Sequence, residues 1–131
     1  MVAIVVATHG ELSSALIQAA EMITGPADGV YSVPLLPGES PETYSDKLAA
    51  LLDRLQGQHV LILLDLFGGT PYNVAARYVL RENTECVTGA NLPMLLELLL
   101  SRDNVPFSEL ARSITQIGSE SIRNLGPMLR K

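Results

Sequence analysis

The sequence has 131 residues, which is enough for one compact domain and too few for two full hydrophobic cores. Hydrophobic residues make up 47% of it and charged residues 18%, as is typical of a folded globular protein. The net charge is −5 and the 9 Lys and Arg residues are scattered along the chain, which argues against a basic nucleic-acid-binding surface. We therefore expect a single domain, residues 1–131, that does not bind nucleic acid.

Cysteine usage and the apolar segments narrow the class further. The single cysteine, Cys86, excludes an internal disulfide and a metal site built from several cysteines. The apolar run at residues 2–7 is too short for a signal peptide and lacks a basic segment before it. The other apolar runs are too short to span a bilayer. These features predict a cytoplasmic protein that is not inserted into the membrane.

The first half of the chain alternates between strand-like and helix-like segments. Residues 2–7 form a β-branched apolar run, typical of a strand buried on both faces, and residues 11–24 carry apolar side chains at helical spacing. Residues 30–36 predict a second strand, and Pro34 within it favours an edge position because proline cannot donate to a neighbouring strand. A second helix is predicted over 41–55.

The second half repeats this alternation around glycine-rich loops. The most apolar strand is predicted over 60–65, which favours the centre of the sheet. Thr70 is expected to be the N-cap of a helix over 71–80. Gly126 and Pro127 are expected to end the last helix and leave a short tail. The remaining elements are a strand predicted over 85–88 and helices predicted over 94–100 and 108–125.

Repeated strand–helix units predict an α/β fold, a doubly wound open sheet of parallel strands with helices on both faces. For four strands we expect the order 2-1-3-4, and the site of such a sheet lies at the carboxyl ends of the strands, where the strand order reverses. His9 follows the first strand by two residues and Asp65 ends the third strand. These two residues are therefore predicted to lie side by side, although they are far apart in the sequence.

The pair of His9 and Asp65 is suited to nucleophilic chemistry. Histidine titrates near neutral pH, so a neutral imidazole with a nucleophilic nitrogen is well populated. A carboxylate that accepts a hydrogen bond from one ring nitrogen fixes the tautomer and leaves the other nitrogen free. The carboxylate also stabilises the cation that forms when the free nitrogen is substituted.

The loop that contains Gly68, Gly69 and Thr70 adds an expected anion site. Glycines let the backbone approach a ligand closely, and the amides of this turn and of the following helix start favour a phosphate. Each feature alone has a structural explanation, as an ordinary surface histidine, an aspartate cap or a tight turn. Their conjunction at one switch point favours phosphoryl transfer through a phosphohistidine, with no cofactor and no metal ion.

The other chemically active residues receive structural interpretations. His59, just before the third strand, is expected at the surface, and Cys86 is expected to be a buried thiol that packs as a small hydrophobe. The leucine-rich helix over 94–100 is expected to contribute to the core or to a dimer contact rather than to a ligand pocket.

Four motifs along the chain together resemble the enzyme IIA component of the mannose (mannose-fructose-sorbose) class of bacterial phosphoenolpyruvate-dependent sugar phosphotransferase systems. They occur in order, with matching spacing, and cover nearly the whole chain. Any one of them would be weak evidence, and the combination is specific. The motifs are ATHG at 7–10, PGE at 37–39, DLFGGTPYN at 65–73 and GANLPM at 89–94.

This resemblance implies roles for individual residues. His9 matches the histidine that accepts phosphate from the histidine-containing phosphocarrier protein and passes it to enzyme IIB. Asp65 matches the carboxylate that holds the imidazole, and Gly69 and Thr70 match positions that hydrogen-bond the phosphoryl oxygens. Phe67 stands where some members carry Trp, and we expect it to be partly exposed and to contact partner proteins.

The resemblance also implies assembly and leaves alternatives. It implies a homodimer in which two copies exchange a C-terminal segment, and we expect residues 128–129 to form the exchanged strand. The phosphocarrier subunit of a dihydroxyacetone kinase shares the expected fold and histidine, and a flavodoxin-like binding module would place an anion at the same switch point. The GGTP sequence at 68–71 and the short loop around His9 favour the sugar phosphotransferase class.

Overall fold

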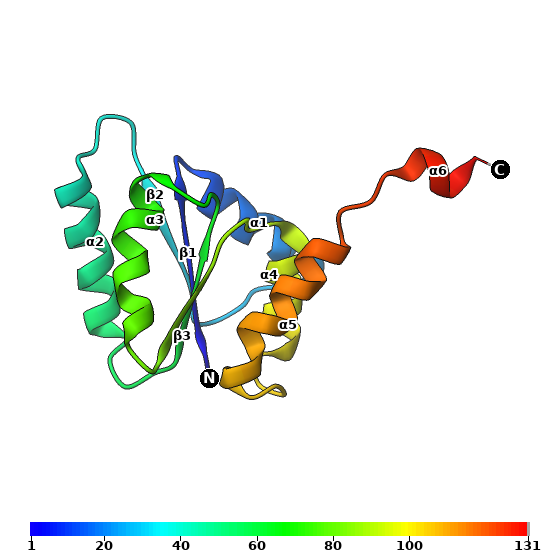
Figure 1. Cartoon of the computed structure of the whole chain (residues 1–131). Coiled ribbons are helices and arrows are strands. Elements are labelled where there is room, and N and C mark those ends of the chain that lie inside the picture. Colours follow the sequence, from blue (N-terminus) through cyan, green and yellow to red (C-terminus); the bar gives the residue numbers. More distant parts are fainter. Residues whose placement is uncertain (131) are drawn as a thin grey trace.

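Four parallel strands form one sheet in the order β2-β1-β3-β4, in a computed structural model that describes residues 1–130 (Figure 1). The predicted strand order is therefore confirmed, and so are the edge position of the strand that contains Pro34 and the central position of the third strand. The strands are β1 (Ala3–His9), β2 (Val30–Leu35), β3 (Val60–Leu64) and β4 (Thr84–Val87).

Seven helical segments complete the fold. They are α1 (Leu12–Thr24), α2 (Pro41–Arg54), α3 (Gly69–Ala75), the 3-10 helix η1 (Ala76–Leu80), α4 (Leu92–Ser101), α5 (Phe107–Glu120) and α6 (Leu125–Leu129). Two of the longer helices have side-chain caps: the Ser40 hydroxyl accepts from the Thr43 N–H at 3.1 Å, and Asn91 Oδ1 accepts from the Met94 N–H at 3.0 Å. No helix within residues 1–130 is long and apolar enough to cross a bilayer.

The sheet is buried on both faces, as the continuous apolar strands predict. Alternate residues of β1 point to opposite faces, so Val5 and Ala7 pack with α2 and α3, and Ile4 and Val6 pack with α1, α4 and α5. Figure 1 shows these two layers of helices on opposite sides of the sheet. The loops that follow the four strands at their carboxyl ends are thereby held at one edge of a core that is packed on both faces.

Two boundaries near this edge differ from the prediction. His9 is the last residue of β1 rather than two residues beyond it, because its backbone N–H donates to Asp65 Oδ2 at 3.0 Å and Leu35 of β2 still lies alongside. The prediction of Thr70 as an N-cap is wrong, since the helix begins earlier and Gly68 is its N-cap. Gly68 has a φ of 140°, which only glycine adopts readily, so the chain turns into α3 before it reaches Thr70.

The C-terminal prediction is also wrong in its details. Helix α5 ends at Glu120 because its Gly118 carbonyl is already occupied, by the Ser121 hydroxyl at 2.6 Å and by Asn91 Nδ2 at 3.3 Å. Gly126 and Pro127 do not break a helix but lie inside α6, in whose first turn a proline removes no helical hydrogen bond. Residues 128–129 are helical in this single chain, not a strand, and Lys131 lies outside the described residues.

Candidate active site

His9 and Asp65 lie next to each other, as the strand order predicted. Ala7 of β1 pairs with Leu64 of β3, so the residues that follow these two leave the sheet together. His9 Nδ1 lies 3.0 Å from Asp65 Oδ2, and the same oxygen accepts the His9 backbone N–H at 3.0 Å. The imidazole side chain is 45% exposed and the carboxylate only 13%. A partner can therefore reach the ring, while its orienting group stays sheltered.

These contacts fix the tautomer of the ring. A carboxylate can only accept, so the proton in the short contact belongs to Nδ1, and Nε2 keeps its lone pair. Asp65 Oδ1 is buried and has no hydrogen-bond partner among residues 1–130. Because this carboxylate is only partly satisfied, it favours a positive charge on the neighbouring imidazole when Nε2 is substituted. The arrangement suits a nitrogen nucleophile.

Gly69 lies against the Nε2 edge of the His9 ring. A Cβ atom built on Gly69 would come within 2.9 Å of both Cε1 and Nε2 of His9, so no larger residue fits there without displacing the imidazole. The backbone φ of Gly69 is 85°, which L side chains rarely adopt. The sequence therefore needs glycine at this position for two reasons, and the loop backbone lies directly beside Nε2, with Thr70 as the next residue.

An apolar rim of exposed side chains, made of Phe67, Leu12 and Leu66, follows the two site residues in the chain. Phe67 is 78% exposed, as expected, and its ring contacts Tyr72 edge-to-face with the centroids 5.0 Å apart. Leu12 and Leu66 are also exposed and follow His9 and Asp65 closely in the chain. The sequence prediction did not include them, although an apolar residue directly after a site residue in an otherwise polar loop is a usable signal.

A groove of about 800 Å³ extends from this rim along β4, on the side of that strand where no other strand pairs. Phe67, Tyr72, Cys86, Thr88, Ala111 and Thr115 are among its lining residues. Cys86 is half-buried rather than fully buried, and it lies on the edge strand β4. Burial, with a smaller contribution from Glu85, raises the pKa of this thiol to about 12, so it stays protonated at neutral pH.

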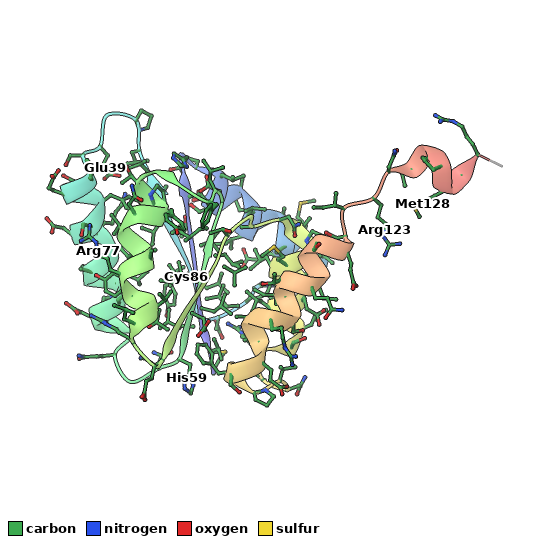
Figure 2. All side chains as sticks on the ribbon, in the orientation of Figure 1. Glu39, His59, Arg77, Cys86, Arg123 and Met128 are labelled. Carbon is green, nitrogen blue, oxygen red and sulfur yellow. The ribbon has the colours of Figure 1, made fainter. Side chains whose placement is uncertain are left out.

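His59 lies away from this site. Figure 2 shows it at the opposite end of the sheet from Glu39, and its ring is exposed and stacks on Phe107 with the centroids 4.4 Å apart. The prediction of a surface residue is confirmed. No group of three or more His, Cys, Asp and Glu side chains within the described part of the chain is arranged to hold a metal ion.

Comparisons with known proteins agree with the fold. The model of a family described as "EIIA-man: PTS system fructose IIA component" matches residues 3–115. The chain therefore belongs to this family of IIA components of the phosphotransferase system (PTS). This membership agrees with the sugar phosphotransferase class and gives no support to a flavodoxin-like binding module.

Two curated relatives show the extent of the likeness. The "PTS system mannose-specific EIIAB component" of Escherichia coli K12 is 39% identical over 127 residues, which are 95% of this chain and 39% of that protein. The chain thus spans well under half the length of that relative. The "PTS system fructose-specific EIIA component" of Bacillus subtilis 168 is 32% identical over 133 residues, with 100% of this chain and 91% of that protein covered.

Solved structures show the same fold. A PTS IIA protein associated with the fucose utilization operon of Streptococcus pneumoniae has a TM-score of 0.87 at 32% identity, over 98% of this chain and 96% of that one. A mannose/sorbose-specific IIA subunit from Enterococcus faecalis has a TM-score of 0.87 at 30% identity, over 93% of this chain and 92% of that one.

Proposed function

We propose that this protein is a phosphoryl carrier, in which His9 accepts a phosphoryl group from the histidine-containing phosphocarrier protein and passes it to enzyme IIB. The observation that carries the proposal is the 3.0 Å contact between His9 Nδ1 and Asp65 Oδ2, because it leaves the lone pair of Nε2 free on a partly exposed ring. Membership of the IIA family supports the phosphotransferase role. The phosphocarrier protein as the donor and enzyme IIB as the acceptor are part of the proposal.

In the first transfer, the lone pair of His9 Nε2 forms a bond to phosphorus, and the phosphorus–nitrogen bond of the donor phosphohistidine breaks. The electrons of that bond return to the donor ring, and the His9 ring becomes a phosphorylated cation that still carries its Nδ1 proton. Asp65 stabilises this cation through the hydrogen bond to Nδ1 and needs no proton transfer of its own. The second transfer is the same step in reverse, with a ring of enzyme IIB as the acceptor.

Gly68, Gly69 and Thr70 are proposed to hold the phosphoryl oxygens. The contact of Gly69 with the Nε2 edge of His9 supports this, because a group bonded to Nε2 would lie next to the backbone of the loop. Backbone N–H groups and a threonine hydroxyl are donors for phosphoryl oxygens. Residues 66–72 contain no charged side chain, so backbone and hydroxyl groups are the donors that the loop offers.

Labelling with phosphoenolpyruvate tests the proposal. Enzyme I, the phosphocarrier protein and this chain should together yield one phosphoryl group per chain, acid-labile and alkali-stable as expected of a phosphohistidine. His9→Ala should abolish labelling, and the matched control His59→Ala should label normally, since His59 lies at the far end of the sheet. Undiminished labelling of His9→Ala would refute the assignment.

The protein is further proposed to act as a homodimer through its C-terminal segment. The segment leaves the body of the molecule after α5 and projects away from it (Figure 1), with Ile122, Leu125 and Leu129 exposed. The apolar groove along the unpaired edge of β4 offers a place for the same segment of a second copy. Truncation after Asn124 should shift the mass measured by sedimentation from dimer toward monomer, and a monomeric full-length chain at micromolar concentration would refute this assembly.

A further inference from the structure

The turn between β2 and α2 contains the PGE motif, at residues 37–39, which the mechanism above does not use. Glu39 closes this turn from both directions. Its Oε1 accepts the Leu36 N–H at 3.1 Å, and its own backbone N–H donates to the Leu36 carbonyl at 3.0 Å. Both backbone groups of Leu36 are therefore bound to one residue, which fixes the position of Leu36 in the turn.

Lys47 of α2 binds the carboxylate of Glu39 and the edge strand β2. Its ammonium donates to Oε1 and Oε2 of Glu39 at 3.0 and 3.1 Å and to the Pro34 carbonyl at 2.6 Å. The Leu35 carbonyl accepts the Gly10 N–H, so the Pro34 carbonyl, one residue earlier, points to the open edge of the sheet, where no strand pairs with it. Glu39 is only 12% exposed, and Lys47 33%, so water screens this contact less than a fully exposed pair.

The turn held by Glu39 and Lys47 lies beside His9. His9 pairs with Leu35 in the register of β1 and β2, and Leu36 is the next residue, with 42% of its surface exposed. The turn therefore borders His9 on the side opposite to Asp65, because β1 lies between β2 and β3. Figure 2 shows Glu39 in this turn, at the end of the sheet where the strands end.

We propose that Glu39 and Lys47 are positioning residues for partner docking: they hold Leu36 ready beside His9, so that the phosphocarrier protein meets a preformed apolar contact. The proposal rests on the carrier function proposed above. Without the contacts of Glu39 and Lys47, the turn has to become ordered when the partner binds. Ordering a side chain at an interface costs about 0.5–1.5 kcal/mol, which corresponds to about a two- to tenfold loss of affinity. The rival explanation is that the pair only stabilises the edge strand.

Two phosphoryl donors separate these explanations. The phosphocarrier protein needs a docking surface, whereas phosphoramidate is a small molecule that reports only on the nucleophile. Glu39→Ala and Lys47→Met should raise the KM for the phosphocarrier protein about two- to tenfold with little change in kcat. Their rates with phosphoramidate should equal that of the wild type. Asp53→Asn changes an exposed acidic residue at the other end of α2 and is the matched control. It should change neither the KM for the phosphocarrier protein nor the rate with phosphoramidate.

Conservative variants and a direct contact variant sharpen the test. Glu39→Gln keeps an acceptor for the Leu36 N–H but loses the charge, so its KM should lie between those of the wild type and Glu39→Ala. Leu36→Ala should raise KM as Glu39→Ala does, and the double variant should add little, because both changes remove the same contact. An unchanged KM in folded Glu39→Ala protein would overturn the proposal. If phosphoramidate did not label the wild type at all, the carrier function itself would be overturned instead.

Discussion

The carboxyl and amino ends of the sheet each expose a histidine, and the two residues differ in what touches their rings. At the carboxyl end, His9 contacts a sheltered carboxylate through Nδ1 and a glycine through its Nε2 edge. At the amino end, His59 stacks on Phe107, which fixes no tautomer and presents no charge. Both histidines are exposed, so it is their neighbours, and not their exposure, that distinguish His9 as the candidate site residue.

At the amino end, one buried arginine binds several segments of the chain. Arg102 is only 8% exposed, yet its guanidinium binds no carboxylate within residues 1–130 and instead donates to backbone carbonyls. These are Asp28 at 2.6 Å, Val2 at 3.3 Å and Gly29 at 3.4 Å. One side chain thus joins the end of α4 to the start of β1 and to the loop before β2. Arg102 therefore joins three segments of the chain at the end of the sheet away from His9.

Asp65→Asn should give the largest effect at the carboxyl end. The amide keeps the shape of the carboxylate but removes the charge that supports a substituted ring, and it no longer selects the Nδ1–H tautomer. Transfer from the phosphocarrier protein should slow by about 10²- to 10⁴-fold in rapid-quench measurements, while circular dichroism and melting temperature stay close to those of the wild type. A transfer rate near normal would show that Asp65 is only a structural cap.

Arg102→Met should affect the opposite property. The methionine fills the space of the arginine stem but leaves the bound carbonyls without donors, at a cost of about 2–4 kcal/mol in the free energy of unfolding measured with urea. The phosphoryl transfer rate per folded molecule should be unchanged, since Arg102 lies at the end of the sheet away from His9. A variant that lost transfer but kept its stability would reverse the assignment of the two ends.

Phe67→Ala should produce a smaller change, confined to docking. An exposed aromatic residue at the edge of the site is suited to be the anchor of a partner interface, and its removal should raise the KM for the phosphocarrier protein about tenfold. The control is Phe107→Ala, which removes the half-buried aromatic ring that stacks on His59 at the amino end of the sheet. It should lower stability and leave that KM unchanged. A KM for Phe67→Ala equal to that of the wild type would remove Phe67 from the partner contact.

Much of the site was predictable because it follows from topology. Continuous apolar strands and short connections are enough to predict a parallel sheet in the order 2-1-3-4, and that order places His9 beside Asp65 without any knowledge of their contacts. The end of β1 was less predictable. His9 remains in the strand because a side chain from a residue 56 positions away accepts its N–H, which local propensity does not contain.

Other features depended on competition between side chains and backbone. The apolar spacing over 108–125 continues past Glu120, but Ser121 and Asn91 occupy the carbonyl that the next helical turn would need. The contact between Glu39 and Lys47 could not be predicted from the sequence either. These residues are 8 positions apart, across a turn and a helix start, so sequence spacing alone does not pair them. Only the packing of α2 along β2 brings the two charges together.

The smallest expected effect concerns acid stability at the turn beside His9. The hydrogen bond from the Leu36 N–H and, next, the contact with Lys47 hold the pKa of Glu39 below its usual value of 4.5. A carboxyl with a lowered pKa in the folded state stabilises the fold above its unfolded pKa, and this contribution is lost as the pH falls through the folded pKa.

The difference in urea midpoint between the wild type and Glu39→Gln should therefore be full at neutral pH and shrink below pH 4.5. Glu42→Gln, an exposed acidic residue in the first turn of the same helix, is the control for general charge effects, and it should show no matching loss. A midpoint difference for Glu39→Gln that is the same at both pH values would mean that the ionised carboxylate is not what closes the turn. The role of Glu39 would then rest on the acceptor that glutamine retains, and the variant should dock the phosphocarrier protein as well as the wild type does.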